Sequence, residues 1–223
     1  VFTHALEACV STDRNDFATA LAEKAIEICG VFLLRAYLDG SDTHARQKMH
    51  SASCLAGLAF NSASLGLNHG MAHQLGATFH IPHGRANAML LPHIITFNAD
   101  LGRIRNGEYA LAAKKYQRMA KVLDLPAPRV LPAVERYKTV ARILGLSSYN
   151  TIMTVRNLVN WVQFMLKEMD IPLSVSQMGK ISKEEYFAEI ERMAEAALAD
   201  GCTATNPRVP SKADVMKIYE SLW

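Results

Sequence analysis

The stretch HGMAHQLGATFHIPHG, residues 69–84, holds four of the eight histidines in this 223-residue chain. Its first half has a helical pattern, which places His69 and His73 one turn apart on the same face. The Pro-His-Gly sequence around His83 is typical of a loop, and such a loop can bring a third imidazole back toward that face. Neutral imidazole is the commonest protein ligand for divalent transition metals. The spacing therefore favours a metal site built from histidines in this stretch.

The His-x-x-x-His spacing also occurs in zinc proteases, whose mechanism needs a glutamate directly after the first histidine. Gly70 occupies that position here, so a hydrolase of this class is disfavoured. The spacing does not indicate which residues complete the ligand set. His4, considered alone, is predicted to be a structural histidine in a helix. The remaining four histidines are expected to be structural or solvent-facing, and they are His44, His50, His80 and His93.

Composition and charge exclude several broad classes of protein. Hydrophobic residues make up 50% of the chain, which is enough for a sizeable core, and the formal net charge is +3. Lys and Arg are scattered, so no nucleic-acid partner is expected, and the apolar runs are too short to span a membrane. The four cysteines form no Cys-x-x-Cys pair. We expect them to be free thiols in a reducing cytoplasm, and they are Cys9, Cys29, Cys54 and Cys202.

Apolar residues recur with the 3.6-residue period of helices along nearly the whole chain. Ser182, as part of a capping box, and Ser211 each precede such a pattern as N-caps. Gly40 is expected to end, as a C′ glycine, a helix marked at its start by Phe17. Prolines fall between the patterns, and alternating strand-like runs are absent. We therefore predict a single all-α, metal-binding domain over residues 1–223.

Three ordered segments carry a resemblance to a known family. They are FTHALEACVS (2–11), NSASLGLNHGMAHQLGATFHIPHGRANAMLLPHIITFN (61–98) and GCTATNPR (201–208). With these segments the chain resembles the helical C-terminal domain of the iron-containing (group III) alcohol dehydrogenases, which have a dehydroquinate synthase-like fold. It is most similar to the short-chain alcohol and diol branch, which includes lactaldehyde reductases and microcompartment propanol dehydrogenases. The resemblance implies a cytoplasmic enzyme and leaves a bacterial microcompartment open as its location.

The resemblance assigns roles to four histidines. The family holds its metal with one aspartate and three histidines, and the matching histidines are His4, His69 and His83. The matching aspartate is expected one residue before Val1, so the chain is expected to lack residues at its start. His73 matches a pocket residue beside the nicotinamide, which implies that it binds the cofactor and relays the catalytic proton.

The resemblance also implies a substrate channel. Phe60 and Cys202 match residues that line this channel in the family. The Asn-Pro-Arg sequence at 206–208 resembles a stretch that closes over the channel, although a plain turn before a helix explains it equally well. The family's metal is usually Fe²⁺, and Zn²⁺ is an alternative because it generally binds such ligands more tightly.

The intact enzyme implied by the resemblance oxidises a short primary alcohol to its aldehyde, reversibly and with NAD. The family's N-terminal dinucleotide-binding domain is expected to be missing, because no Gly-rich phosphate loop follows a strand anywhere in the sequence. We therefore expect this chain alone to be inactive. One alternative is a metal-dependent lyase of the dehydroquinate synthase type, which would need a Lys/Arg cluster where only Arg85 is found. Another alternative is a helical metal-binding or assembly domain without activity. The sequence also leaves open whether the chain forms a homo-oligomer.

Overall fold

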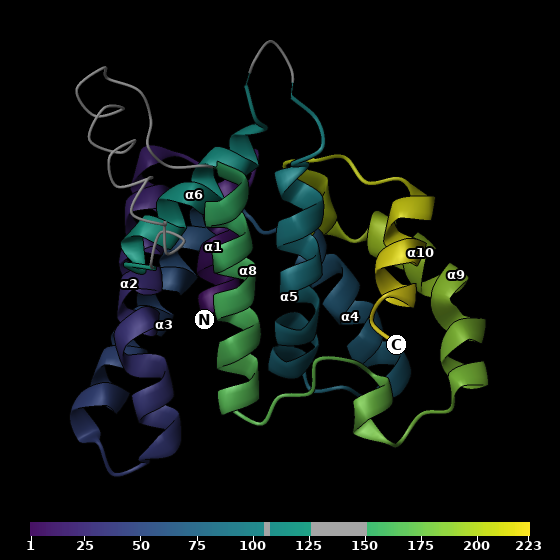
Figure 1. Ribbon diagram of the computed structural model, residues 1–223, viewed down its shortest axis with the longest axis horizontal. Coiled ribbons are helices and arrows are strands. Elements are labelled where there is room, and N and C mark those ends of the chain that lie inside the picture. The colour runs from purple at the N-terminus through teal and green to yellow at the C-terminus, as the bar shows by residue number, and fades with distance from the viewer. Residues whose placement is uncertain (105–107, 126–150) are drawn as a thin grey trace, which may run out of the picture.

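The computed structural model describes residues 1–104, 108–125 and 151–223. The elements in these ranges are all helices, so the prediction of an all-α fold is confirmed (Figure 1). None of these helices has the length and hydrophobicity of a membrane-spanning segment. The α-helices are α1 (Phe2–Val10), α2 (Asp16–Leu38), α3 (Thr43–Ala63), α4 (Leu67–Phe79), α5 (His83–Ala99), α6 (Leu111–Val122), α8 (Thr151–Glu168), α9 (Lys183–Ala199) and α10 (Lys212–Glu220). Two short 3₁₀ helices are η1 (Ser176–Met178) and η2 (Gly201–Thr205).

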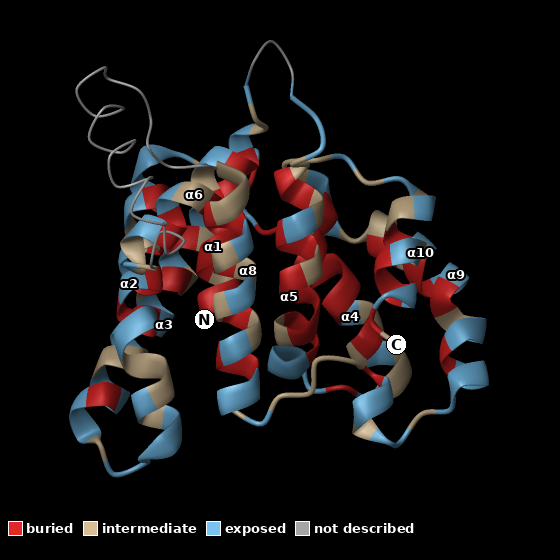
Figure 2. Cartoon of the chain, in the orientation of Figure 1, coloured by how far each residue is buried: buried red, intermediate tan, exposed pale blue. Residues whose placement is uncertain are grey.

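Helix α5 lies between two groups of helices and contributes to the core of each (Figure 1). The first core is formed by α1, α2, α3, α6 and α8, and Leu91 and Ile95 of α5 belong to it. The second is formed by α4, α9 and α10, together with Leu90 and Ile94 of α5. Figure 2 shows buried residues along most of α5. Because α5 is buried on two sides, the position of its first residue, His83, is well defined relative to both groups.

Small side chains let α1, α2 and α3 pack closely against one another. Helix α2 buries alanines such as Ala18, Ala22 and Ala25, and α3 buries alanines such as Ala56 and Ala59 along the facing side. Alanine combines a high helix propensity with little bulk, so these helices can approach at short distance. The result is a closely packed group of three helices, and α1 within this group carries His4.

The predicted N-caps are present. The side chain of Ser211 accepts a hydrogen bond from the backbone N–H of Asp214, and the Asp214 carboxylate accepts one from the backbone of Ser211, which completes a capping box. Ser182 caps α9 by accepting from the backbone N–H of Glu185 at 3.2 Å. No return bond from the Glu185 side chain accompanies it among the described contacts, so the capping box predicted at Ser182 is only half formed.

The helix expected from Phe17 to near Gly40 is found as α2 (Asp16–Leu38), but two of its details differ from the prediction. Helix α2 ends at Leu38 with Asp39 as C-cap, and Gly40 does not adopt the left-handed conformation expected of a C′ glycine. The turn is made instead by Asp39, whose side chain accepts from the Ser41 N–H at 2.8 Å. Phe17, used to mark the start of this helix, is 67% exposed, because α2 buries its alanine face.

Candidate metal centre

The start of α4 is held by side chains from distant parts of the chain. The backbone N–H of Asn68 donates to Glu7 Oε1 at 2.8 Å, and that of Leu67 donates to Asn206 Oδ1 at 3.1 Å. These bonds satisfy two of the backbone donors that a helix leaves free at its N-terminus. A Cβ on Gly66 would lie 2.8 Å from Glu7 Oε1 and 2.9 Å from Asn206 Oδ1, so only glycine fits there. This arrangement fixes the helix that carries His69 and His73.

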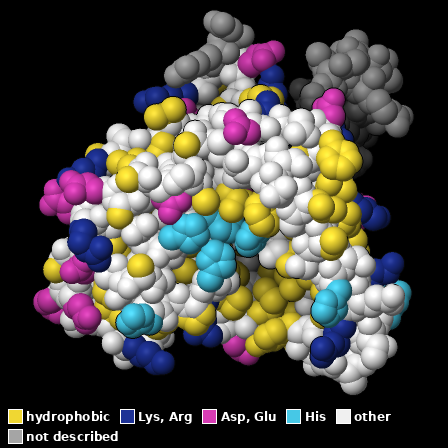
Figure 3. Space-filling model, turned by 180° about the vertical axis from the view of Figure 1, so that it is seen from behind, with side chains coloured by type: hydrophobic (Ala, Val, Ile, Leu, Met, Phe, Trp, Pro, Cys, Tyr) yellow, Lys and Arg dark blue, Asp and Glu magenta, His cyan; other side chains and the backbone are white. Residues whose placement is uncertain are grey.

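The structure brings His4, His69 and His83 together from three helices. One ring nitrogen of each lies within 4.8 Å of those of the other two. His69 is buried, His4 is partly buried, and His83 is exposed. The turn between α4 and α5, which leads to His83, depends on His80. His80 is the C-cap of α4, has the left-handed conformation, and donates its backbone N–H to Gly76 O. Figure 3 shows histidine side chains gathered in the middle of one face, beside a hollow and with hydrophobic side chains around them.

His4 and His83 have the protonation state that a metal requires of its imidazole ligands. Burial, together with the neighbouring His69, lowers the pKa of His4 to about 3. Burial and the nearby His69 and His73 also lower the pKa of His83. Both side chains are therefore neutral near pH 7, and a neutral imidazole has a lone pair free for coordination.

Glu7 orients His69. Its carboxylate is 3% exposed and hydrogen-bonds to His69 Nδ1. With Nδ1–H donating to Glu7, the Nε2 lone pair of His69 faces His4, whose Nε2 lies 3.2 Å away. A histidine that binds a metal through one ring nitrogen usually donates the N–H of its other ring nitrogen to a carboxylate, as His69 does to Glu7. The three imidazoles and this carboxylate therefore fit a divalent transition metal.

His73 lies beside this cluster but has a different partner. Its Nδ1 is 2.8 Å from Asp200 Oδ2, its side chain is 40% exposed, and its ring stacks against that of His83 with 5.7 Å between centroids. The other oxygen of Asp200 accepts from the backbone N–H of Cys202 at 2.9 Å. Burial alone would raise the pKa of the Asp200 carboxyl, but these hydrogen bonds outweigh it, so the pKa is below its ordinary value.

Gly70 allows the turn that carries Asp200 to approach α4. A Cβ at Gly70 would lie 2.1 Å from Thr203 Oγ1 and 3.1 Å from Ala197 O. Thr203 Oγ1 donates to Ala197 O at 2.6 Å and so joins η2 to the end of α9. Gly70, which stands where a zinc protease would have a glutamate, is thus also required by the packing of Thr203 against α4.

The two residues predicted to line a substrate channel lie near different histidines, Phe60 near His4 and Cys202 near His73. The Phe60 ring lies 5.0 Å from that of His4, centroid to centroid. Cys202 has a donor atom within 4.8 Å of donor atoms of His73 and Asp200. Burial and the neighbouring Asp200 raise the pKa of the Cys202 thiol to about 11. Their role at a substrate stays a prediction.

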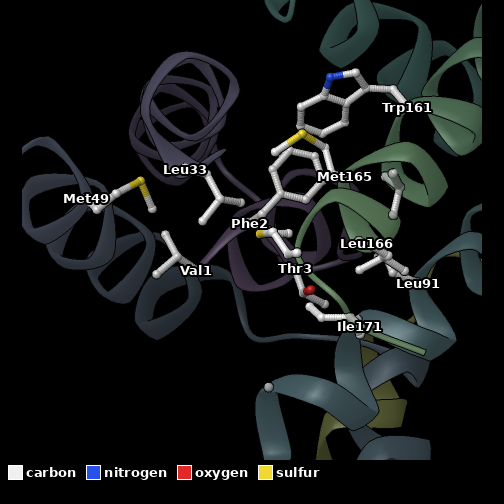
Figure 4. A pocket seen from close by; sticks show the side chains of 14 residues that line it. Val1, Phe2, Thr3, Leu33, Met49, Leu91, Trp161, Met165, Leu166 and Ile171 are labelled. Carbon is white, nitrogen blue, oxygen red and sulfur yellow. The ribbon is translucent and has the colours of Figure 1, made fainter. Parts of the chain in front are cut away.

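An apolar cavity of about 190 Å³ lies near the metal centre (Figure 4). Its lining includes Thr3 and Gly84, the chain neighbours of His4 and His83. Figure 4 shows the labelled side chains that surround it, which are Val1, Phe2, Thr3, Leu33, Met49, Leu91, Trp161, Met165, Leu166 and Ile171. Neither Phe60 nor Cys202 is among the residues that line this cavity.

The Asn-Pro-Arg sequence at 206–208 has clear structural bonds. Asn206 is buried and donates to Asn98 Oδ1 at 2.7 Å, besides capping α4. Arg208 donates to Phe97 O at 2.7 Å and lies over the Phe97 ring at 4.0 Å. These contacts attach the segment to the end of α5 and are those of an anchored turn.

Sequence reasoning did not assign a role to Glu7 or Asp200. Glu7 follows His4 by three residues on α1, and this spacing, which puts both on one helix face, could have indicated it. Asp200 offers no such signal, because it lies 127 residues from His73. The other histidines remain outside the cluster. His93 bonds to Ser221 Oγ at 3.1 Å, and the His44 ring packs against Phe32.

Comparisons with known proteins identify the family of this chain. The model of the Fe-containing alcohol dehydrogenase family, C-terminal, matches residues 1–223. The chain is 40% identical over 222 residues to the 1-propanol dehydrogenase PduQ of Citrobacter freundii, covering 100% of this chain and 52% of that protein. It is 35% identical over 221 residues to the NADPH-dependent butanol dehydrogenase of Clostridium saccharobutylicum, covering 99% of this chain and 48% of that protein.

A solved structure shows the same fold. The 1,3-propanediol oxidoreductase structure matches with a TM-score of 0.79 and 31% identity, over 100% of this chain and 49% of that one. The chain thus spans about half the length of each of these three relatives. It belongs to the Fe-containing alcohol dehydrogenase family, of which it forms the helical C-terminal domain.

Proposed function

We propose that this chain is the metal-binding half of an NAD-dependent dehydrogenase that interconverts a short primary alcohol and its aldehyde. The observation that carries the proposal is the convergence of His4, His69 and His83, with Glu7 behind His69. The relatives named as propanol and butanol dehydrogenases support a short primary alcohol as substrate.

In this proposal His4, His69 and His83 hold Fe²⁺, or Zn²⁺ in its place, and an upstream aspartate completes the ligand set. Three neutral imidazoles suit either ion. The ion supplies Lewis acidity, which polarises the oxygen of the alcohol or aldehyde. Glu7 keeps the Nε2 lone pair of His69 directed at the ion by accepting the proton on Nδ1.

His73 is the proposed proton relay. Because its Nδ1–H donates to Asp200, its Nε2 is free to accept the proton that the alcohol loses. The exposed fraction of its side chain, 40%, gives it access to the space where substrate and nicotinamide would meet. Phe60 and Cys202 are proposed to contact the substrate.

The nicotinamide cofactor must be held by a dinucleotide-binding domain, which we propose as the N-terminal partner of this chain. Hydride transfer needs the nicotinamide within roughly 3–3.5 Å of the substrate carbon, so the chain alone should be inactive. NAD is the proposed cofactor, and the name of the butanol dehydrogenase makes NADPH the competitor to test.

The test compares the 223-residue chain with the same chain fused to the dinucleotide-binding half of the propanol dehydrogenase. Both are loaded with Fe²⁺ under anaerobic conditions and assayed by nicotinamide absorbance with 1-propanol, 1-butanol and their aldehydes. We expect turnover by the fusion and none by the chain alone. Turnover by the chain alone would contradict the proposed division of the enzyme. A folded fusion that binds its metal but oxidises no primary alcohol would contradict the proposed reaction.

A further inference from the structure

We propose that His73, Asp200 and Cys202 form a second cation site, selective for zinc-like ions, whose occupation switches His73 off as a proton relay. The existence of the site depends only on these three side chains. The effect on catalysis rests on the function proposed above.

The three donors differ in chemistry and meet at one place. They are an imidazole nitrogen, a carboxylate oxygen and a sulfur, each within 4.8 Å of the others. Within the described residues they form a group distinct from the three-histidine cluster. His73 comes from α4, Asp200 lies between α9 and η2, and Cys202 belongs to η2. A metal would therefore join two elements that already lie side by side.

The turn is ordered before any ion arrives. Asp200 accepts from His73 Nδ1 at 2.8 Å and from the Cys202 N–H at 2.9 Å. Thr203 Oγ1 donates to Ala197 O, and Gly70 leaves room for Thr203 against α4. The ion would need only small movements to bring donors at these separations to about 2.0–2.3 Å from itself. The 40% exposure of the His73 side chain provides a route from solvent.

The donor set indicates which ion binds. Zn²⁺ is bound in proteins by sulfur, nitrogen and carboxylate oxygen, usually in a tetrahedron, and water would supply the fourth ligand here. Mg²⁺ and Ca²⁺ prefer oxygen ligands, so the thiol disfavours them. Binding forms a zinc–sulfur bond and releases the Cys202 thiol proton to solvent. The raised pKa of that thiol makes the binding stronger as the pH rises.

Occupation of this site would change the tautomer of His73. Without the ion, Nδ1 carries the proton, donates to Asp200 and leaves Nε2 free. When Nδ1 binds the ion, the neutral ring must carry its proton on Nε2. Nε2 can then no longer accept a proton from the alcohol. Zinc at this site would thus inhibit the enzyme without displacing the metal held by His4, His69 and His83.

Cobalt(II) gives a direct test, because a cobalt–thiolate bond produces an intense near-ultraviolet charge-transfer absorption and a cobalt–imidazole bond does not. The reduced 223-residue chain is titrated with Co²⁺ and then with Zn²⁺. We expect two ions per chain, thiolate absorption from one of them, and loss of that absorption as Zn²⁺ replaces Co²⁺. Cys202→Ser should lose the absorption but still bind one ion. Cys54→Ser changes an exposed cysteine outside the site and should behave like the parent.

Two outcomes would overturn the proposal. One is the absence of thiolate absorption at saturating Co²⁺, and the other is its persistence in Cys202→Ser. A second measurement compares inhibition of the alcohol-oxidising fusion with inhibition of its Cys202→Ser variant. Each rate is expressed relative to that protein's own rate without added Zn²⁺, and Zn²⁺ should slow the parent more than the variant, because exchange of Zn²⁺ for Fe²⁺ at the three-histidine site affects both equally. If the cobalt signal appears and Zn²⁺ slows both proteins equally, the site stands and its link to the proton relay is wrong.

Discussion

Glu7→Gln is the substitution that best probes how the metal centre is built. Glu7 is 3% exposed, and its two oxygens serve two different donors, His69 Nδ1 and the Asn68 N–H. Glutamine has nearly the same shape, so the space beside Gly66 is still filled, but only one of its two terminal atoms is an acceptor. Glutamine can therefore accept a hydrogen bond from only one of the two donors.

Both arrangements of the glutamine are unfavourable. If its oxygen stays with the Asn68 N–H, its amide group donates to His69 Nδ1, and the His69 proton moves to Nε2, which faces His4. The metal then has no lone pair to bind at His69. If the amide is reversed, two donors face each other at the start of α4, which costs about 1–3 kcal/mol. We expect an overall loss of metal affinity of about 10–100-fold, equivalent to roughly 1.4–2.8 kcal/mol.

Isothermal titration calorimetry of the chain with Zn²⁺ measures this loss, in a Cys202→Ser background that removes the second site. The control is Glu23→Gln, which changes a carboxylate that pairs with Arg118 away from the metal centre. The control should bind metal like its parent. If Glu7→Gln folds normally and binds metal with unchanged affinity, then Glu7 does not orient His69 and the reasoning is refuted.

Three further predictions concern the surroundings of the centre. Gly70→Ala should lower the free energy of unfolding by about 1–3 kcal/mol because of its clash with Thr203, whereas Gly57→Ala, which has open space in a helix, should raise it by up to about 1 kcal/mol. Urea denaturation measures both. Asp200→Asn should slow alcohol oxidation by the fusion about 10²–10⁴-fold in kcat with the metal retained, because His73 loses its tautomer. Burial lowers the pKa of His93 in the folded chain, so the unfolded chain binds a proton more readily at this residue. The free energy of unfolding should therefore fall as the pH drops below about 6.5, and it should fall less steeply in His93→Gln than in the parent.

Each of these predictions has a contrary result. Equal stability of the two glycine variants would mean that α4 and η2 are not in close contact. A normal rate in Asp200→Asn would mean that His73 needs no orienting partner. An identical pH dependence in His93→Gln and the parent chain would mean that His93 takes up no proton on unfolding.

The helical fold was predictable because it depends on local sequence. Apolar periodicity and the capping box at Ser211 lie within a few residues of the structure they specify, and both are found. The conformation of Gly40 and the exposure of Phe17 differed from the prediction because they depend on contacts that the apolar periodicity does not report. The end of α2 is set by the Asp39 side chain, and its buried face is set by close packing against α1 and α3.

The site was predictable only in part. His69 and His73 share a helix, but His4 lies 65 residues from His69 and was assigned only through the family resemblance. The pairing of Glu7 with His69 spans 62 residues, and that of Asp200 with His73 spans 127. Such contacts are fixed by tertiary packing, and no single-sequence pattern reports them.

Metal analysis of four histidine variants tests the central claim most directly. In the Cys202→Ser background, His4→Ala, His69→Ala, His83→Ala and His73→Ala are dialysed against limiting Fe²⁺ or Zn²⁺ and the bound ion is counted. We expect the parent and His73→Ala to retain one ion per chain and the other three variants to lose it. The central claim would be contradicted if His73→Ala emptied the site as completely as His69→Ala, or if the three ligand variants kept their metal.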